Sequence, residues 1–523
     1  MNKRKEIWIL FVGIFSFLFL IGVILTLIFF ASWIYALLLI ITFYVLSIGL
    51  SFYLFNSKKR IINVKLCWIF VIFAIPIVGL FIFIIFGINP LLKVDQKTYM
   101  ENQNEWINYE SFDFTNNFLS SKNKNINYQN LFSYGYVLQK RPIYENNKIR
   151  IIEQDNLYWE SIKLIREAKK FIHLQYYIIS DGVWLRSIAN ELIKQSRNGI
   201  KIRFIYDWVG SYKRKHEKII KQMREAGIFV GIFNPKKITK YTSSTNFRCH
   251  RKCLIIDNEK ALYGGSNIGD EYICYSSNFV HWYDNNIILE GECVKTLNLI
   301  FSLDWIFNCY VPKKQKQIDD LSTNKEFYLN TKIDLNDYEN KTIAQVFERT
   351  ANYVDFNMPT MLIHAFSNAK KRIWLSTPYY LPGDNITDLL KFAALSGIDV
   401  RLVVPGFPDD KKYILTINRF HYDALLDAGV KIYEYNGFDH GKIVLIDDDL
   451  IICSTSNLDF RSLLINYESG ILIQNTDVAK KYENELNKLF ALSSVIYKNS
   501  FSKHEKNLIR FKMLFINVYH PLL

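Results

Sequence analysis

The N-terminal part of this sequence lacks charge. From Ile7 to Ser57 it contains no Asp, Glu, Lys or Arg. Hydrophobic residues make up 50% of the chain and aromatic residues 16%, and they are concentrated unevenly, with this uncharged segment among the richest. An uncharged segment of this length argues against a chain that is exposed to water throughout.

Cysteine is scarce and irregularly spaced. The chain has seven cysteines among 523 residues, an odd number without the regular spacing of a disulfide framework. Cys249 and Cys253 flank His250, but a zinc site requires a second pair of ligands and none follows. We therefore expect neither required disulfides nor a metal site.

Three apolar stretches fill the N-terminal region: Ile7–Phe30, Trp33–Phe55 and Leu66–Phe86. Each has roughly the 20 residues that a helix needs to cross a bilayer. The first is too long for a signal peptide, and no cleavage region follows it. Residues 1–88 are therefore predicted to form a transmembrane region of about three helices. The positive-inside rule places the remainder outside if there are three spans and inside if there are two, so its sidedness stays open.

The chain is basic, with 64 Lys and Arg against 50 Asp and Glu and a net charge of +14. A basic balance suits any polyanion, whether nucleic acid, acidic lipid headgroups or a phosphorylated substrate. Beside an apolar N-terminus, anionic membrane lipid is the favoured partner, and we expect no nucleic acid.

The rest of the chain has the pattern of an α/β fold, because strand-like and helix-like segments alternate. Residues 89–147 are predicted to be a connector, because they are polar and lack apolar periodicity. We expect a first half at 148–320, a second half at 321–495 and a basic amphipathic tail at 496–523. The tail suits either an anionic membrane surface or ordinary helix packing.

The second half repeats the order of the first, and the repeat is clearest in one motif. His-x-Lys-x4-Asp occurs twice, first as His250, Lys252 and Asp257 and then as His440, Lys442 and Asp447. Both copies are followed by Ser-Asn at the same distance, so that the offset between the copies is constant. Two homologous α-β-α halves packed around one active site are the simplest explanation.

The paired motifs suit the chemistry of a phosphodiester. In an extended segment alternate side chains share a face, so each His projects together with its Lys. One neutral imidazole can attack phosphorus and form a phosphohistidine, while the other exchanges protons with the leaving and incoming hydroxyls. The lysines would neutralise the non-bridging oxygens, a mechanism that needs no metal and no cofactor. A single motif would be weak evidence, whereas two at equivalent places are specific.

Other residues are candidates for supporting roles. Asp257 and Asp447 end buried runs, so direct chemistry and hydrogen bonding to nearby backbone are both open. Asp284 and Glu468 follow aromatic residues and are better candidates to orient the imidazoles. Three further residues are candidates for binding phosphate oxygens or for closing turns: Ser266, Asn267 and Asn457.

These motifs resemble the phospholipase D superfamily, and within it the bacterial cardiolipin synthases. The narrower resemblance rests on Asn246–Lys252, Gly264–Tyr272 and Thr377–Pro382, and it covers nearly the whole chain. The sequence departs from the family pattern at Gly265, where Ser or Thr is common, and at Ser454, where Gly is usual. Three spans would also exceed the two usually expected.

The resemblance implies that one phosphatidylglycerol transfers its phosphatidyl group to another, giving cardiolipin and glycerol, at a bacterial plasma membrane in a multi-pass protein. It also implies that His250 is the nucleophile and His440 the general acid and base. A phospholipase D or another phosphatidyltransferase, differing only in the acceptor, is the first alternative. A catalytically silent membrane scaffold is the second, and the intact His and Lys of both motifs argue against it.

Overall fold

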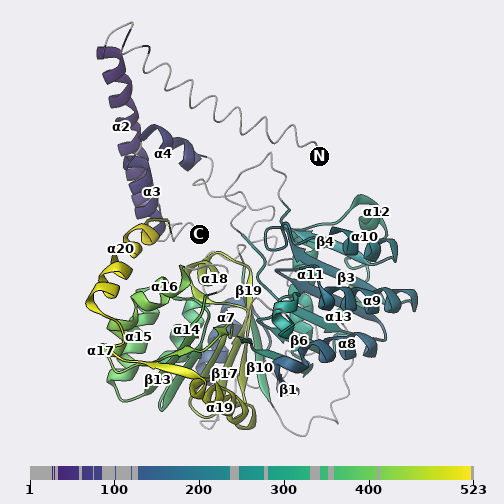
Figure 1. Ribbon diagram of the computed structural model, residues 1–523. Coiled ribbons are helices and arrows are strands. Elements are labelled where there is room, and N and C mark those ends of the chain that lie inside the picture. Colours follow the sequence, from purple (N-terminus) through teal and green to yellow (C-terminus); the bar gives the residue numbers. More distant parts are fainter. Residues whose placement is uncertain are drawn as a thin grey trace. The chain divides into compact units, whose positions relative to one another are not determined.

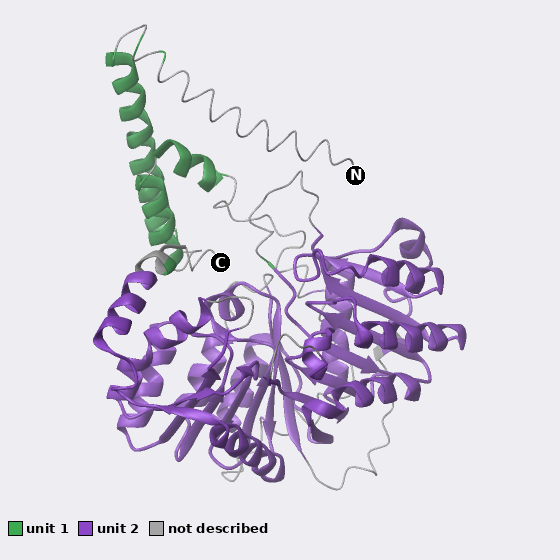
Figure 2. Cartoon of the chain, in the orientation of Figure 1, with its two compact units in different colours: residues 1–92, 236–247, 514–523 green, residues 93–235, 248–513 purple. Residues whose placement is uncertain are grey.

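The computed structural model describes residues 33–57, 62–74, 76–84, 128–235, 247–275, 281–329, 342–350, 358–408 and 413–519, with positions 26, 29, 101 and 119. The chain divides into two compact units (Figure 2). The first comprises residues 1–92, 236–247 and 514–523, and the second comprises 93–235 and 248–513.

The first unit contains three described N-terminal helices, α2 (Trp33–Asn56), α3 (Ile62–Ala74) and α4 (Pro76–Ile82). They share a small apolar cluster that includes Trp68 and Phe83, whose rings lie 5.3 Å apart. Among the described residues, α2 is the one helix long and apolar enough to cross a membrane.

The prediction of about three spans is therefore not confirmed. The second predicted span, Trp33–Phe55, matches α2. The third is divided into α3 and α4 at Pro76, which has no backbone N–H to continue the helical hydrogen bonding. The first predicted span, Ile7–Phe30, lies outside the described residues apart from positions 26 and 29.

The second unit contains two eight-stranded sheets (Figure 1). The strands of the first sheet, in spatial order, are β1 (Asn147–Ile152), β8 (Asn286–Gly291), β6 (Lys260–Gly264), β5 (Cys253–Ile256), β2 (Phe171–Tyr176), β3 (Lys201–Asp207), β4 (Phe229–Phe233) and β9 (Cys309–Tyr310). Strands β2, β3 and β4 are parallel, and the other neighbours pair antiparallel.

The second sheet has the same arrangement. Its strands, in the corresponding order, are β10 (Ile343–Arg349), β19 (Glu468–Gln474), β17 (Leu450–Ser454), β16 (Ile443–Ile446), β11 (Arg372–Ser376), β13 (Asp399–Pro405), β14 (Lys431–Tyr435) and β20 (Ser493–Ile496). Strands β11, β13 and β14 are parallel and the rest pair antiparallel. The α/β class predicted from the sequence is confirmed.

Alternation along β2 explains the layers around the first sheet. Ile172, Leu174 and Tyr176 belong to the apolar core shared with α8 (Leu157–Glu167), α9 (Val183–Arg197) and α10 (Glu217–Glu225). The side chains between them face the other way, because successive residues of a strand alternate. His173 and Gln175 there bond Asn298 and Asp304 of α11 (Val294–Asn308).

Helices also cover the second sheet. They contact it as follows: α15 (Asp384–Leu395) at β13, α17 (Tyr422–Asp427) at β14, and α19 (Thr476–Ala491) at β14, β16, β17 and β20. The side chains of α19 pack closely, since the Phe490 ring lies 5.3 Å from that of Trp374. The described C-terminal helix is α20 (Lys503–Tyr519).

Short strand pairs join the segments that precede each motif to the opposite half. Strand β15 (Phe438–Asp439) pairs in parallel with β7 (Trp282–Tyr283), so that the His440 amide donates to the Tyr283 carbonyl at 2.7 Å. An isolated bridge between Cys249 and Tyr467 is its counterpart, and the His250 amide donates to the Tyr467 carbonyl at 2.8 Å. Each motif histidine is thus held by the other half of the unit.

Candidate active site

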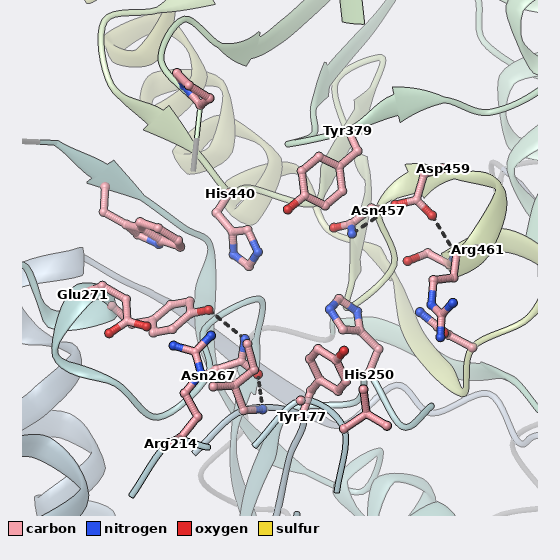
Figure 3. Close-up of a pocket in the computed structure, with 18 residues that line it drawn as sticks. Tyr177, Arg214, His250, Asn267, Glu271, Tyr379, His440, Asn457, Asp459 and Arg461 are labelled. Carbon is pink, nitrogen blue, oxygen red and sulfur yellow. Dashed lines mark hydrogen bonds between the residues drawn. The ribbon is translucent and has the colours of Figure 1, made fainter. Parts of the chain in front are cut away.

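The two motif histidines line one cavity of about 670 Å³ (Figure 3). His250 and His440 stand in the short extended segments directly before β5 and β16, and in the close-up their imidazoles extend into the same space. The other lining residues are Tyr177, Ile178, Val209, Gly210, Arg214, Asn267, Glu271, Tyr272, Trp282, Tyr379, Pro408, Asn457, Asp459, Arg461, Ser462 and Asn466.

A short hydrogen bond to a carboxylate orients the His440 ring. Its Nδ1 lies 2.6 Å from Oδ2 of Asp284, which directly follows β7 in the first half. A carboxylate at this distance accepts a hydrogen bond from Nδ1–H, which keeps the proton on Nδ1 and leaves Nε2 as the nitrogen open to the cavity. Because β7 pairs with the strand before His440, the same pairing that joins the halves also positions this carboxylate.

His250 is held by two acceptors. Its Nδ1 lies 3.0 Å from one oxygen of Glu468 and 3.0 Å from the carbonyl oxygen of Thr455. The Thr455 hydroxyl donates to Glu468 at 2.6 Å, so the carboxylate is itself fixed. Asp284 and Glu468, the partners predicted from the sequence, therefore each contact the Nδ1 atom of one imidazole. Their role in catalysis stays a prediction.

Burial keeps both imidazoles neutral in the free cavity. It lowers the pKa of His440 to about 3, with the Lys442 charge acting in the same direction and Asp284 against it. The pKa of His250 is also lowered, chiefly by burial, and Glu468 opposes the change. Two neutral rings with fixed Nδ1 protons therefore present Nε2 lone pairs to the cavity, which is what a nucleophile requires.

The motif lysines lie behind the imidazoles. Each Nζ donates to the carbonyl oxygen of its own motif histidine at 2.6 Å, and neither lysine lines the cavity. Burial lowers the pKa of Lys252 to about 7, and the nearby charge of Lys442 adds to this effect. The pKa of Lys442 is lowered as well, mainly by burial. Their charges can therefore influence a ligand in the cavity electrostatically, without direct contact.

The motif aspartates bind backbone. Three consecutive amides leading into a strand donate to each carboxylate, those of Lys169, Lys170 and Phe171 to Asp257 and those of Lys370, Lys371 and Arg372 to Asp447. Neither Asp257 nor Asp447 lines the cavity. Of the two roles considered for them, these contacts favour the structural one.

The amide and hydroxyl candidates differ in their access to the cavity. Asn267 lines it, but its side chain accepts from the Ile178 amide at 3.0 Å and donates to Tyr272 at 2.9 Å. Asn457 also lines it, and its buried Oδ1 has no hydrogen-bond partner in the described part of the chain. Ser266 does not line the cavity, and its hydroxyl accepts from Asn286.

Several cavity residues were not identified from the sequence. The Tyr177 ring lies 5.1 Å from that of His250, and the Trp282 ring lies 5.2 Å from that of His440. Arg214 follows the parallel strand β3. Ligands of open α/β sheets bind beyond the carboxyl ends of such strands, so its position in the sequence could have indicated that it lines the site. Glu271 and Tyr379 lie inside segments that carry the family resemblance, although no role was assigned to them.

A family model described as "Cardiolipin synthase, PLD-like domain" matches residues 161–305 and 362–490. The chain belongs to this family. Each matched range contains one His-x-Lys-x4-Asp motif and the central strands of one sheet. The resemblance to bacterial cardiolipin synthases of the phospholipase D superfamily is therefore confirmed.

Individual relatives agree with the family model. The chain is 32% identical to a cardiolipin synthase of Alkalihalophilus pseudofirmus over 457 residues, which cover 87% of either chain. It is 30% identical to a cardiolipin synthase of Clostridium perfringens over 446 residues, 83% of this chain and 89% of the relative. The crystal structure of a phosphatidylserine synthase from Haemophilus influenzae matches at 16% identity with a TM-score of 0.55, covering 75% of this chain and all of that one, and it shares the fold.

Proposed function

We propose that this protein is a cardiolipin synthase, which transfers a phosphatidyl group from one phosphatidylglycerol to another and releases glycerol. The observation that carries the proposal is one cavity lined by two imidazoles, each with its Nδ1 beside a buried carboxylate. Family membership supports the lipid substrate, and the geometry supports covalent catalysis.

In the first step Nε2 of His250 attacks the phosphorus of the donor lipid. A P–N bond forms, the bond from phosphorus to the glycerol headgroup oxygen breaks, and His440 gives a proton to that oxygen. His440 is neutral in the empty cavity, but the bound phosphodiester anion favours its protonated form and raises its pKa. The Asp284 carboxylate then stabilises the imidazolium.

In the second step His440, now neutral, removes a proton from a headgroup hydroxyl of a second phosphatidylglycerol. The hydroxyl oxygen forms the new P–O bond, the P–N bond to His250 breaks, and cardiolipin is released. Lys252 and Lys442 stabilise the negative charge that develops on the phosphoryl oxygens, since their buried ammonium groups act through a medium of low dielectric.

The wider architecture follows from the same proposal. The two sheets with equal strand order are homologous halves, about 148–320 and 321–495, and Asp257 and Asp447 fix the strand starts in each. Residues 1–88 anchor the enzyme in the bacterial plasma membrane, with α2 as one span of a multi-pass region. This placement is supported by the apolar character of the N-terminus and by a substrate that is itself a membrane lipid.

The proposal is tested with purified full-length protein in phosphatidylglycerol vesicles, without added nucleotide or metal. We expect cardiolipin and glycerol in equal amounts, measured by mass spectrometry and by an enzymatic glycerol assay. Phosphatidic acid as the only lipid product would show that water is the acceptor and would make the protein a phospholipase D. No turnover of any phospholipid would contradict an enzymatic role altogether.

A further inference from the structure

The two halves place opposite charges at equivalent positions of the cavity. The segments Asn267–Tyr272 and Asn457–Ser462 follow the two motifs at the same distance, so that Glu271 corresponds to Arg461. Both side chains line the cavity. In Figure 3 they lie at opposite ends of the labelled residues, with the two imidazoles between them.

The halves differ again two residues before this pair, where Gly269 of the first half corresponds to Asp459 of the second. A Cβ at Gly269 would lie 2.6 Å from a carboxylate oxygen of Glu271, so the absence of a side chain leaves room for that carboxylate. The corresponding residue of the second half, Asp459, accepts from the Ser462 amide at 2.7 Å and caps the helix that carries Arg461. The local structure of each half therefore suits its own charged residue: Gly269 leaves room for Glu271, and Asp459 caps the helix that carries Arg461.

Glu271 belongs to the His440 end of the cavity. The ring of Tyr272, its chain neighbour, lies 5.8 Å from the His440 ring. Asp270 fixes the same turn by accepting the amides of Val183 and Trp184, each at 3.0 Å. Glu271 thus directly precedes a residue whose ring approaches the imidazole that serves as acid and base in the proposed mechanism, and Figure 3 shows it on the His440 side of the cavity.

The surroundings of Glu271 suit neutral hydroxyl donors. Within the described part of the chain its carboxylate forms no ion pair, and burial raises its pKa, against which its own backbone amide and the charge of Arg214 act. A carboxylate accepts hydrogen bonds at several positions and can bind two neighbouring hydroxyls at once. It repels a phosphate group, whereas the exposed Arg214 at the same end of the cavity attracts one.

We propose that Glu271 binds the glycerol headgroup of phosphatidylglycerol and that Arg214 binds the phosphate attached to that headgroup in the acceptor lipid. This inference rests on the proposed function. Departing and incoming glycerol share the subsite, because the same imidazole protonates one oxygen and deprotonates the other. At the opposite end the equivalent position is the cation Arg461, and both oxygens of the Asp459 carboxylate there accept hydrogen bonds from the chain itself, so we place the glycerol subsite at the Glu271 end.

The test compares two reactions of the full chain in vesicles. Cardiolipin formation from phosphatidylglycerol requires the glycerol subsite, whereas the initial burst of p-nitrophenol from phosphatidyl-p-nitrophenol, one equivalent per active site, requires only attack by the nucleophile. In Glu271→Gln, a substitution that preserves side-chain shape, we expect the ratio of cardiolipin formation to nitrophenol release to fall by about tenfold or more. The matched control is Glu225→Gln, which removes an exposed carboxylate of α10 and should leave the ratio unchanged.

Arg214→Gln separates the two parts of the subsite. Transfer from phosphatidyl-p-nitrophenol to free glycerol, which gives phosphatidylglycerol, needs Glu271 but involves no second phosphate. We expect Arg214→Gln to weaken phosphatidylglycerol as an acceptor more than free glycerol, and Glu271→Gln to weaken both. Equal loss of nitrophenol release and cardiolipin formation in Glu271→Gln, or no loss of either, would overturn the inference. A wild-type protein that releases nitrophenol but forms no cardiolipin would instead overturn the proposed function.

Discussion

The two sheets of the second unit share a scaffold but differ in the side chains that they present to the cavity. Strand order, strand direction and the backbone amides that bind the motif aspartates are equivalent in both. The contacts that hold the imidazoles differ: within the described part of the chain His440 Nδ1 contacts only Asp284, whereas His250 Nδ1 contacts both Glu468 and a backbone carbonyl. The backbone is thus symmetric where it assembles the cavity, and the side chains are asymmetric where the proposed chemistry needs two different histidines.

The largest effects are expected when the two histidines are removed one at a time. We expect His250→Ala and His440→Ala each to lower cardiolipin formation by about 10³-fold or more, because they remove the nucleophile and the proton carrier. With phosphatidyl-p-nitrophenol, whose leaving group needs little acid catalysis, His440→Ala should still release one equivalent of nitrophenol and then stop.

His250→Ala should release no such burst, and intact-protein mass spectrometry should find the phosphatidyl adduct only when His250 is present. The matched control is His504→Ala, since His504 is exposed on α20. A burst in His250→Ala but not in His440→Ala would exchange the two roles between the halves. Robust cardiolipin synthesis in either variant would contradict a shared site.

The anchoring carboxylates provide the next largest expected effect. Asp284→Asn replaces the acceptor of the His440 Nδ1 proton and destabilises the imidazolium, and we expect cardiolipin formation to fall on the order of 10²-fold or more. Glu468→Gln should cost less, because the Thr455 carbonyl still accepts the Nδ1 proton of His250. Steady-state rates of the two variants in the same vesicles measure the difference. Equal losses would show that the carbonyl contributes nothing to holding the ring.

The buried motif lysines lead us to expect that activity is lost as the pH rises. The pKa of Lys252 is lowered to about 7, so its charge is present below that pH and is lost above it. We therefore expect kcat/KM for phosphatidylglycerol to fall more steeply above about pH 7 than below it, since this parameter reports the free enzyme, in which His440 must also gain a proton. The bound phosphodiester stabilises the ammonium, so kcat should decline only at higher pH. A kcat/KM that is constant from pH 6 to about 9 would contradict the requirement for a charged Lys252.

Much of the scaffold could be predicted from the sequence because it is duplicated. A fixed offset between His250 and His440 signals two equivalent halves, and a repeated pattern of apolar runs signals their strands. Asp284 and Glu468 could be selected because each follows aromatic residues at a similar place in its half, and the structure puts both on Nδ1 atoms.

Other features depend on three-dimensional placement. That Glu271 and Arg461 face one cavity follows from how the halves pack across β7 and β15, which no local pattern encodes. Likewise the lysines were expected to converge on the cavity surface, but their ammonium groups turn to the backbone carbonyls of the neighbouring histidines. The membrane region is predicted with least detail, because apolar composition gives span length and not the effect of Pro76.

The smallest expected effect concerns Asp447, the motif aspartate of the second half. Tyr128, directly before α7 (Gln129–Gln139), donates to Asp447 at 2.9 Å, in addition to the backbone amides that Asp447 accepts. Tyr128→Phe removes this one hydrogen bond and should lower the free energy of unfolding by about 1 kcal/mol. The measurement is the apparent midpoint of thermal unfolding in detergent, compared with Tyr497→Phe, whose side chain is exposed. Turnover at temperatures below the transition should be unchanged if Asp447 serves the scaffold, whereas a large loss of turnover with an unchanged midpoint would assign this aspartate to the chemistry.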